Sequence, residues 1–344
     1  MNDILKALLG ALERGESIAQ AAILTHEGST PRSAGSRMLL ASGLITGNGG
    51  PVILAGTVGG GLVEAQVMRA GAQVLADGLR RVERFDLTGE LAAGADMICG
   101  GRLTVFLERL EPGDLPLWRE LSATLGRGQR VLRLVPQGEG EARLVAPGEP
   151  ACPLALAARL AGFEAGRGIS APVALEHEGR SYVLEPWAPA SPLVILGAGH
   201  VSRPTAQMAA LCGFQVTVLD DRAEFASAER FPGAETRVLE SYSGCLAGVP
   251  TGPEASVVIV TRGHVHDAEA LAQALRTGAG YVGMIGSRRK RDAVYQRLRG
   301  QGFTDADLAR VRCPIGLDIG AETPEEIAVS IVGELVAHRA GKAL

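Results

Sequence analysis

Two glycine-containing loops in the first third of the chain have the composition of anion-binding sites. The first loop, THEGSTPRSAGSRM, places Ser29, Thr30 and Arg32 between glycines. Hydroxyls, a guanidinium and free backbone amides together suit a phosphate. The glycines of the second loop, AGTVGGGLVEAQ, are Gly59, Gly60 and Gly61. They precede an expected helix, whose N-terminus also favours an anion. A hairpin turn and a flexible joint with Glu64 in the first helical turn are the structural alternatives.

A cysteine in the stretch DMICGGRLTVFLE is the strongest candidate for contact with a soft metal. Cys99 stands directly before Gly100 and Gly101, so a ligand can approach the thiol across bare backbone, and nearby Arg102 favours the thiolate. Thiolate sulfur suits a soft metal or a sulfur-transfer step. A free cysteine is more often a small buried residue. We expect that role for Cys152, Cys212 and Cys245.

The second half of the chain contains part of a dinucleotide-binding fingerprint. In LVILGAGHVSRP, Gly197 and Gly199 lie in a turn between an expected strand and a helix that starts near His200. Asp220 ends the next expected strand, where a carboxylate can accept hydrogen bonds from a ribose. Ser202 occupies the third glycine position. The pattern predicts a Rossmann-like fold and leaves open whether NAD, another phosphate-bearing cofactor or no nucleotide binds.

Two histidines follow another apolar strand, in VVIVTRGHVHDAEAL. His264 and His266 are expected in a loop at the carboxyl end of this strand, the edge where open α/β sheets bind ligands. Asp267 is expected to cap the next helix. We interpret the two imidazoles as lining a ligand cleft together with His200, where they could carry protons near neutral pH. A zinc site and a purely structural loop are the alternatives.

Basic residues open a later expected helix, in MIGSRRKRDAV. Positive charge in a first helical turn opposes the helix dipole, so an acidic ligand or partner would explain residues 288–290. Near the C-terminus, Thr323 as N-cap with Pro324 and Glu326 forms a capping box, for which we expect only a structural role.

Composition narrows the classes of partner. The 344 residues contain 34 Lys and Arg against 38 Asp and Glu, with 4% aromatic residues, so neither a basic patch nor stacking platforms point to nucleic acid. Five scattered cysteines indicate a reducing compartment. No signal peptide or run of about 20 apolar residues is found, so we expect a cytoplasmic protein without a membrane partner.

The pattern of elements predicts an α/β protein of two domains, residues 1–188 and 189–344. A helix ending at Gly15 precedes strands and a second helix from about Gly61, whose buried face is expected to be Leu62, Ala65, Met68 and Ala72. The stretch EPWAPASP, residues 185–192, reads as the linker. Beyond it, short apolar strands alternate with helices, which predicts a doubly wound parallel sheet.

Several long stretches together resemble the XdhC/CoxI family of xanthine dehydrogenase accessory proteins. They are EGSTPRSAGSRM, GTVGGGLVE and MICGGRLTVFLE in the first half, then ILGAGHVSRPTAQMAALCGFQVTVLDDRAEFASAERFP, VVIVTRGHVHDAEAL, YVGMIGSRRK and CPIGLDIGAETPEEIAVSIVGEL. They cover most of the chain outside about 110–180.

The resemblance implies a maturation factor rather than a metabolic enzyme. Such a protein would bind the molybdenum cofactor, protect it while a cysteine desulfurase installs its terminal sulfur, and deliver it to a molybdenum hydroxylase of the xanthine dehydrogenase type. Cys99 would lie close to the molybdenum, and the two N-terminal loops would hold the phosphate or pterin. We expect the cofactor in a cleft between the domains of a homodimer, since two-fold symmetry is the commonest.

Two other functions fit the same residues. One is an NAD(P)-dependent oxidoreductase that uses His200 or His264 as acid or base. The other is a scaffold that bridges the desulfurase and the hydroxylase without retaining cofactor.

Overall fold

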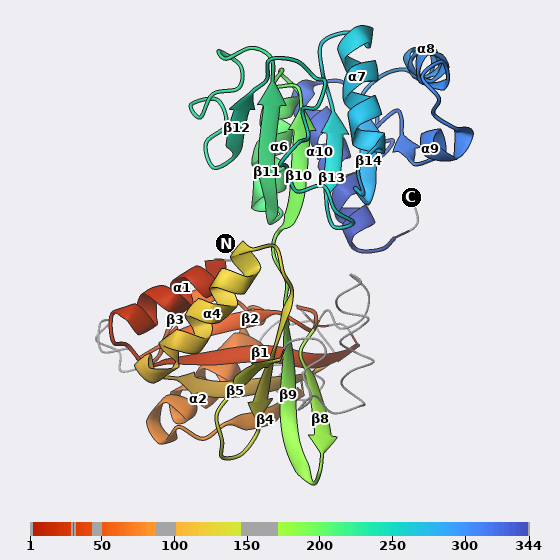
Figure 1. Ribbon diagram of the computed structural model, residues 1–344. Coiled ribbons are helices and arrows are strands. Elements are labelled where there is room, and N and C mark those ends of the chain that lie inside the picture. Colours follow the sequence, from red (N-terminus) through yellow and green to blue (C-terminus); the bar gives the residue numbers. More distant parts are fainter. Residues whose placement is uncertain are drawn as a thin grey trace. The chain divides into compact units, whose positions relative to one another are not determined.

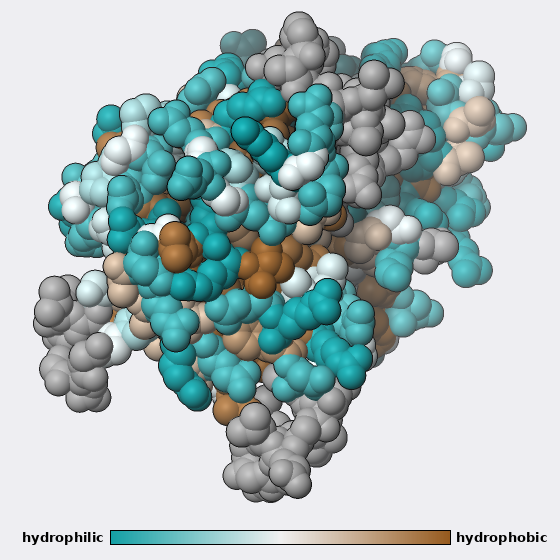
Figure 2. Space-filling view, turned by 90° about the horizontal axis from the view of Figure 1, so that it is seen from below, coloured by the Kyte–Doolittle hydropathy of each residue, from teal (hydrophilic) through white to brown (hydrophobic). Residues whose placement is uncertain are grey.

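The computed structural model describes residues 3–28, 30, 32–42, 50–86, 101–145 and 171–342 of the chain (Figure 1). The chain divides into two compact units, Met1–Pro189 and Ala190–Leu344. Within the described residues there is no helix that is both long and apolar enough to cross a bilayer. Hydrophilic side chains dominate the face in Figure 2, with a smaller apolar area near the middle of the view.

The first unit is built on an antiparallel sheet of five strands in the order β3-β2-β1-β5-β4. The strands are β1 (Ile18–Gly28), β2 (Arg37–Ala41), β3 (Val52–Gly56), β4 (Arg81–Asp86) and β5 (Gly101–Leu110). Side chains alternate between the two faces of β1. One face packs against α2 (Leu62–Asp77), and the other against α1 (Asp3–Glu13) and α4 (Leu115–Gly126), which follows a short 3-10 turn, η1 (Pro112–Asp114). Helices therefore cover both sides of this sheet.

The buried face of α2 differs from the expected one. The helix buries Val63, Val67, Ala70, Gly71 and Val74, whereas Ala65 is exposed and Leu62, Met68 and Ala72 are only partly buried. Both sets recur at intervals of three and four residues, so periodicity alone did not distinguish them. The valine stripe packs against the sheet.

A second antiparallel sheet completes the first unit, in the order β7-β6-β9-β8. Its strands are β6 (Val131–Pro136), β7 (Arg143–Val145), β8 (Val173–His177) and β9 (Arg180–Trp187). Residues 185–187 thus belong to β9, and the next strand begins at Ser191, so the expected linker 185–192 is too long. Pro186 is tolerated because pairing with β8 stops at Leu184, and its missing N–H breaks no bond on that side.

A buried charge cluster joins the two sheets. The guanidinium of Arg133 on β6 donates to Glu108 on β5 at 2.9 Å and to Glu185 on β9 at 2.7 Å. Gln20 on β1 donates to Glu185 at 2.8 Å. All four side chains are at most 1% exposed. Trp118 lies against Arg133, with 4.6 Å between the guanidinium carbon and the ring centroid. Buried charges are stable only when paired in this way.

The second unit is a parallel sheet of six strands in the order β12-β11-β10-β13-β14-β15. The strands are β10 (Ser191–Leu196), β11 (Phe214–Asp220), β12 (Glu235–Val238), β13 (Ser256–Ile259), β14 (Tyr281–Met284) and β15 (Val311–Arg312). The helices are α6 (Ser202–Leu211), α7 (His264–Leu275), α8 (Arg288–Arg299), α9 (Asp305–Ala309) and α10 (Pro324–Arg339).

Helices pack on both faces of this sheet, as the sequence predicts. Helices α7 and α8 pack on one face, and α6 and α10 on the other. The strand order reverses between β10 and β13, which makes their carboxyl ends the switch point where such sheets bind ligands. The capping box of α10 is confirmed, because Thr323 accepts from the amide of Glu326 and the Glu326 carboxylate accepts from the amide of Thr323.

Candidate functional site

The turn after β10 gives its two glycines different roles. Gly197 has φ +105°, and a Cβ there would lie 2.5 Å from the carbonyl oxygen of Val260. Only glycine fits, because the turn passes directly beside the chain that leaves β13. At Gly199 a Cβ would meet nothing within 4 Å. The second glycine therefore borders open space on the side where a ligand would approach.

Ser202 explains the missing third glycine. Its buried hydroxyl donates to the carbonyl of Gly197 at 2.6 Å, so it fastens the first turn of α6 to the glycine turn. The amides of Gly199, His200 and Val201 have no partner within the described part of the chain. The imidazole of His200 is exposed. Free amides at a helix N-terminus favour an anion.

Asp220, expected to accept a ribose, is fully engaged within the protein. Its carboxylate accepts from the amide of Ala198 at 2.7 Å and from Arg222 through Nε at 2.8 Å, Nη2 at 2.9 Å and the amide at 3.0 Å. Burial opposes ionisation, but these bonds outweigh it and hold the pKa of Asp220 below its usual range. The carboxylate fixes the glycine turn and offers no free oxygen to a nucleotide in this conformation.

The loop after β11 brings a second arginine to the same turn. Arg222 and Arg230 both lie on the ring of Phe225, with guanidinium carbons 3.7 and 4.7 Å from its centroid. Nη2 of Arg230 also lies 3.5 Å from the carbonyl oxygen of Ala198. These arginines were missed as site residues by the sequence reasoning. The only available signal was their position just after the strand that carries Asp220.

Helix α7 begins four residues earlier than a cap at Asp267 would place it. Gly263, with φ +86°, precedes the helix, so His264 is its first residue and Asp267 is not the cap. The structure describes the backbone of His264 but not its side chain. No group of metal-binding residues occurs in the part of the chain that the structure describes.

His266 and Asp267 instead join local contacts at the switch point. The ring of His266 packs against Tyr242 at 5.3 Å between centroids. Asp267 is fully buried, accepts from the hydroxyl of Thr261 at 2.7 Å and is ion-paired with Lys290. Lys290, in the basic first turn of α8, is therefore neutralised within the protein and is not a free charge for an acidic partner.

The three described cysteines of the second unit differ in exposure. Cys245 is buried as expected, and burial raises the pKa of its thiol to about 11. Burial likewise raises the pKa of Cys313 to about 11. Cys212 is exposed, so the expectation that it is buried was wrong. It lies just past the end of α6, where the chain turns at the surface. Cys152 lies outside the described residues.

The strands that flank the N-terminal loops point to one end of the five-stranded sheet. Gly28 pairs with Gly101 across β1 and β5, and Met38 pairs with Gly56 across β2 and β3. Strands β1 and β3 therefore end, and β2 and β5 begin, toward the same end of the sheet. Ser29, Cys99 and Gly100, which the sequence singled out, lie outside the described residues.

The described residues of these loops make mainly local contacts. Thr30 donates to the carbonyl of Arg32 at 3.0 Å, and the Arg32 side chain is exposed. The hydroxyl of Thr57 accepts from the amide of Gly59 at 3.0 Å and donates to Glu64 at 2.8 Å. Gly60 is exposed, and Gly61 precedes α2 with φ +65°. Glu64 already supplies negative charge in the first turn of α2, as its structural interpretation predicts.

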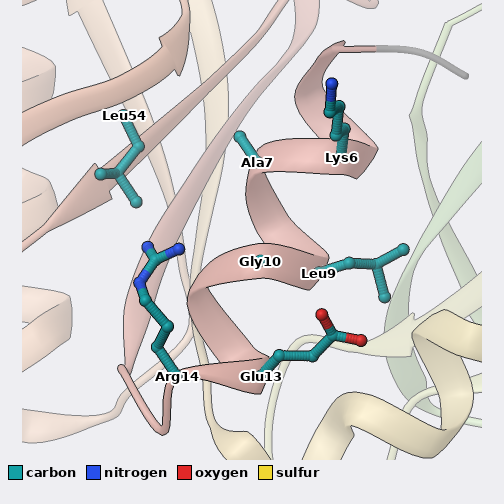
Figure 3. Close-up of a pocket in the computed structure, with 7 residues that line it drawn as sticks. All are labelled: Lys6, Ala7, Leu9, Gly10, Glu13, Arg14 and Leu54. Carbon is teal, nitrogen blue, oxygen red and sulfur yellow. The ribbon is translucent and has the colours of Figure 1, made fainter.

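The first unit also has a groove, which is lined by residues outside these loops. It is lined by Lys6, Ala7, Leu9, Gly10, Glu13 and Arg14 of α1 and its end and by Leu54 of β3 (Figure 3). None of the residues singled out from the sequence is among them.

The parallel sheet and the glycine turn after β10 together define an α/β protein with a Rossmann-type C-terminal unit. Family comparisons make this more specific, since the XdhC Rossmann domain matches residues 193–335 and the XdhC and CoxI family matches residues 11–86. The chain belongs to the XdhC and CoxI family, which confirms the resemblance noted in the sequence.

Known proteins similar to the chain are distant relatives. The uncharacterized protein YqeB of Escherichia coli K12 is 28% identical over 94% of this chain and 44% of its own length. A protein of Bacillus subtilis named as a probable xanthine dehydrogenase subunit is 31% identical over 43% of this chain and 42% of its own length. The chain thus spans less than half of these two relatives.

Two further comparisons extend over nearly the whole chain. The molybdenum cofactor insertion chaperone PaoD of Escherichia coli K12 is 22% identical over 98% of this chain and 88% of its own length. A crystal structure named as a xanthine dehydrogenase from Bacillus halodurans aligns with a TM-score of 0.76, 23% identity and coverage of 100% and 97% of the two chains. At this identity the structural likeness supports the fold alone.

Proposed function

We propose that the chain is a molybdenum-cofactor-binding chaperone that protects the cofactor during sulfuration and delivers it to a xanthine dehydrogenase-type hydroxylase. It acts as a maturation factor rather than as an enzyme. The observation that carries the proposal is family membership, with matches in both units. The similarity to PaoD, named as a cofactor insertion chaperone, spans nearly the whole chain and supports the same role.

The chemistry of the described residues fits a phosphate-bearing pterin. The turn at Gly197 offers amides that have no partner among the described residues, and there is open space beside Gly199. The register of β1 and β5 brings the first loop to the edge where β5 begins, two residues after Cys99. When bound, the cofactor would supply an anionic phosphate and a sulfur-ligated metal. We assign the phosphate or pterin to the N-terminal loops and Cys99 to the neighbourhood of the metal.

The remaining parts of the proposal concern partners. A cysteine desulfurase would supply the sulfur, a molybdenum hydroxylase would receive the cofactor, and the chain would act as a homodimer. Engagement of Asp220 by Arg222 weighs against the alternative of an NAD(P)-dependent oxidoreductase, because the ribose-binding carboxylate of such an enzyme has to be free.

Anaerobic purification from a cofactor-producing host, followed by metal and pterin analysis, tests the proposal. We expect molybdenum and molybdopterin to co-purify with the wild-type chain. Cys99→Ala is expected to lower retention or to block sulfuration. Cys212→Ala, which changes an exposed cysteine, serves as the matched control and is expected to retain wild-type amounts. A wild-type chain without cofactor, or Cys99→Ala that activates the hydroxylase normally, contradicts the assignment.

A further inference from the structure

We infer that the outward face of α10 is the surface through which two copies of the chain pair, with their α10 helices antiparallel across a two-fold axis. The inference deepens one part of the proposed function, the homodimer, on which it rests, and it requires nothing of the cofactor. The occupant of this face is therefore a second copy of the same chain.

Helix α10 is apolar on two sides. Its inner side packs in the core of the second unit through Ile331, Val332 and Leu335. On its outer side Val329 and Val336 are exposed. Because residues seven apart on a helix share a face, the two valines form one stripe. A helix that is apolar all round is typical of a buried position, so the exposed stripe is a candidate for contact with another chain.

Neighbouring side chains enlarge this apolar surface. A Cβ at Gly333, between the two valines, would lie 3.1 Å from Leu317, so the exposed Leu317 side chain lies beside the middle of the stripe. Exposed Leu211 directly precedes Cys212, whose carbonyl accepts from Arg339 in the last turn of α10. Four of the eight large hydrophobic side chains that are exposed in the described chain thus lie on α10 or beside it, and such a patch marks an interaction surface.

The charges at the two ends of α10 have opposite signs. Glu325 is exposed in the first turn, Arg339 is exposed in the last, and Lys342 is exposed just beyond it. In the described parts of the chain none of the three forms an ion pair. A partner of one charge sign would be attracted at one end of the helix and repelled at the other. A second copy of the same face matches both ends at once.

The spacing along α10 fits antiparallel pairing around Gly333. At about 1.5 Å per residue, Val329 and Val336 lie about 6 and 5 Å from Gly333 along the axis, on opposite sides. Glu325 and Arg339 lie about 12 and 9 Å away in the same two directions. When two helices cross near this glycine, each valine meets a valine of the partner and each acidic end meets a basic end. Two-fold pairing of one surface with itself is the usual arrangement in homodimers.

Sedimentation of the full chain over a range of concentrations tests the inference. Wild type is expected to reach about twice the chain mass of 35.7 kDa. Val329→Glu is expected to raise the dissociation constant of the dimer about tenfold or more, because it buries a charge twice, once on each side of the axis. Val238→Glu, at an exposed valine on β12, is the matched control and is expected to keep the wild-type constant.

Reversal of the end charges tests the antiparallel arrangement at low ionic strength. Glu325→Lys and Arg339→Glu are each expected to weaken pairing about tenfold, since each sets like charges together at both ends of the interface. The double variant restores opposite charges and is expected to return to within about threefold of wild type. The two residues lie about 21 Å apart on one helix, so this rescue can occur only between chains. Arg297→Glu, at an exposed arginine on α8, is the control and is expected to have no effect.

The outcomes separate this inference from the cofactor role. A wild-type chain that stays monomeric, a dimer that Val329→Glu leaves intact, or a double charge variant that pairs no better than the single ones overturns it. Melting temperatures show whether Val329→Glu folds, and if it does not, the charge variants decide. A monomeric wild type that retains molybdenum removes the inference and leaves the cofactor role. A wild type that pairs through α10 but retains no molybdenum removes the cofactor role alone.

Discussion

Asp220 is the residue whose role changes most between sequence and structure. A carboxylate at the end of the second strand suggests a ribose acceptor, yet here it accepts four hydrogen bonds from Ala198 and Arg222. Those bonds hold the glycine turn in the conformation that exposes its amides. The carboxylate therefore shapes the backbone of the turn and leaves no oxygen free for another partner.

Asp220→Asn is expected to destabilise the protein by about 1–3 kcal/mol at neutral pH, since it removes charge-assisted hydrogen bonds. The folded-state pKa of Asp220 lies below its unfolded value of about 3.9, so its contribution is complete above that value. The contribution is lost as the pH falls through the folded pKa. The free energy of unfolding, measured in urea, is therefore expected to differ strongly between Asp220→Asn and wild type at pH 7. The difference is expected to be smaller below pH 4.

Asp292→Asn provides the comparison, because its carboxylate is exposed and is paired with neighbouring Arg291. It is expected to change stability little at either pH. An Asp220→Asn difference that stays constant with pH would show that the carboxylate does not stabilise the fold through its charge.

At the scale of elements, the capping boxes define where helices begin. Thr323 caps α10 through the amide of Glu326, and Thr304 caps α9 in the same way through Asp307. Helix α10 packs on α6 and on the sheet. The position at which α10 begins therefore matters for the packing on this face of the second unit.

Thr323→Ala is expected to cost about 1 kcal/mol of stability, because an amide of the first turn loses its acceptor. Thr323→Ser keeps the hydroxyl, and its free energy of unfolding is expected to lie within about a few tenths of a kcal/mol of the wild-type value. Denaturant unfolding of both variants measures the difference. Equal losses in the two would exclude the cap as the cause.

The elements of the second unit were predicted from the sequence more fully than those of the first. Alternation of apolar strands with helices predicted the second unit because its parallel strands are buried on both faces. The second sheet of the first unit was not predicted as a separate sheet. Its buried Arg133 and Glu185 look in the sequence like surface positions, so the contact between the two sheets was not expected. The start of α7 was misplaced because Asp267 resembles a cap, whereas Thr261 and Lys290 hold it inside.

The candidate site was predicted only in part for a related reason. Gly197 and Gly199 follow from a known pattern, since glycine is the residue that permits such a turn. The partners of Asp220 do not, because an arginine two residues away can equally point to solvent. Arg230 lies in an irregular loop with no periodicity to indicate which side it faces.

At the scale of the whole molecule, each unit has hydrophobic clusters of its own. We therefore expect two thermal transitions in calorimetry. Glu108→Gln, which leaves Arg133 short of a buried counter-charge, should cost about 3–5 kcal/mol. It should lower one transition by roughly 10 °C and leave the other unchanged.

Glu111→Gln, at an exposed position paired with Arg109, is the control and should shift neither transition appreciably. A single transition that moves as a whole in Glu108→Gln would mean that the two units unfold cooperatively.

The two glycines of the turn also face different evolutionary pressures. At Gly197 a methyl group would strike the backbone beside β13, so the fold itself rejects replacement whatever the protein binds. At Gly199 the added carbon would meet only vacant space. A lineage that lost its ligand would be free to drift at the second position while keeping the first.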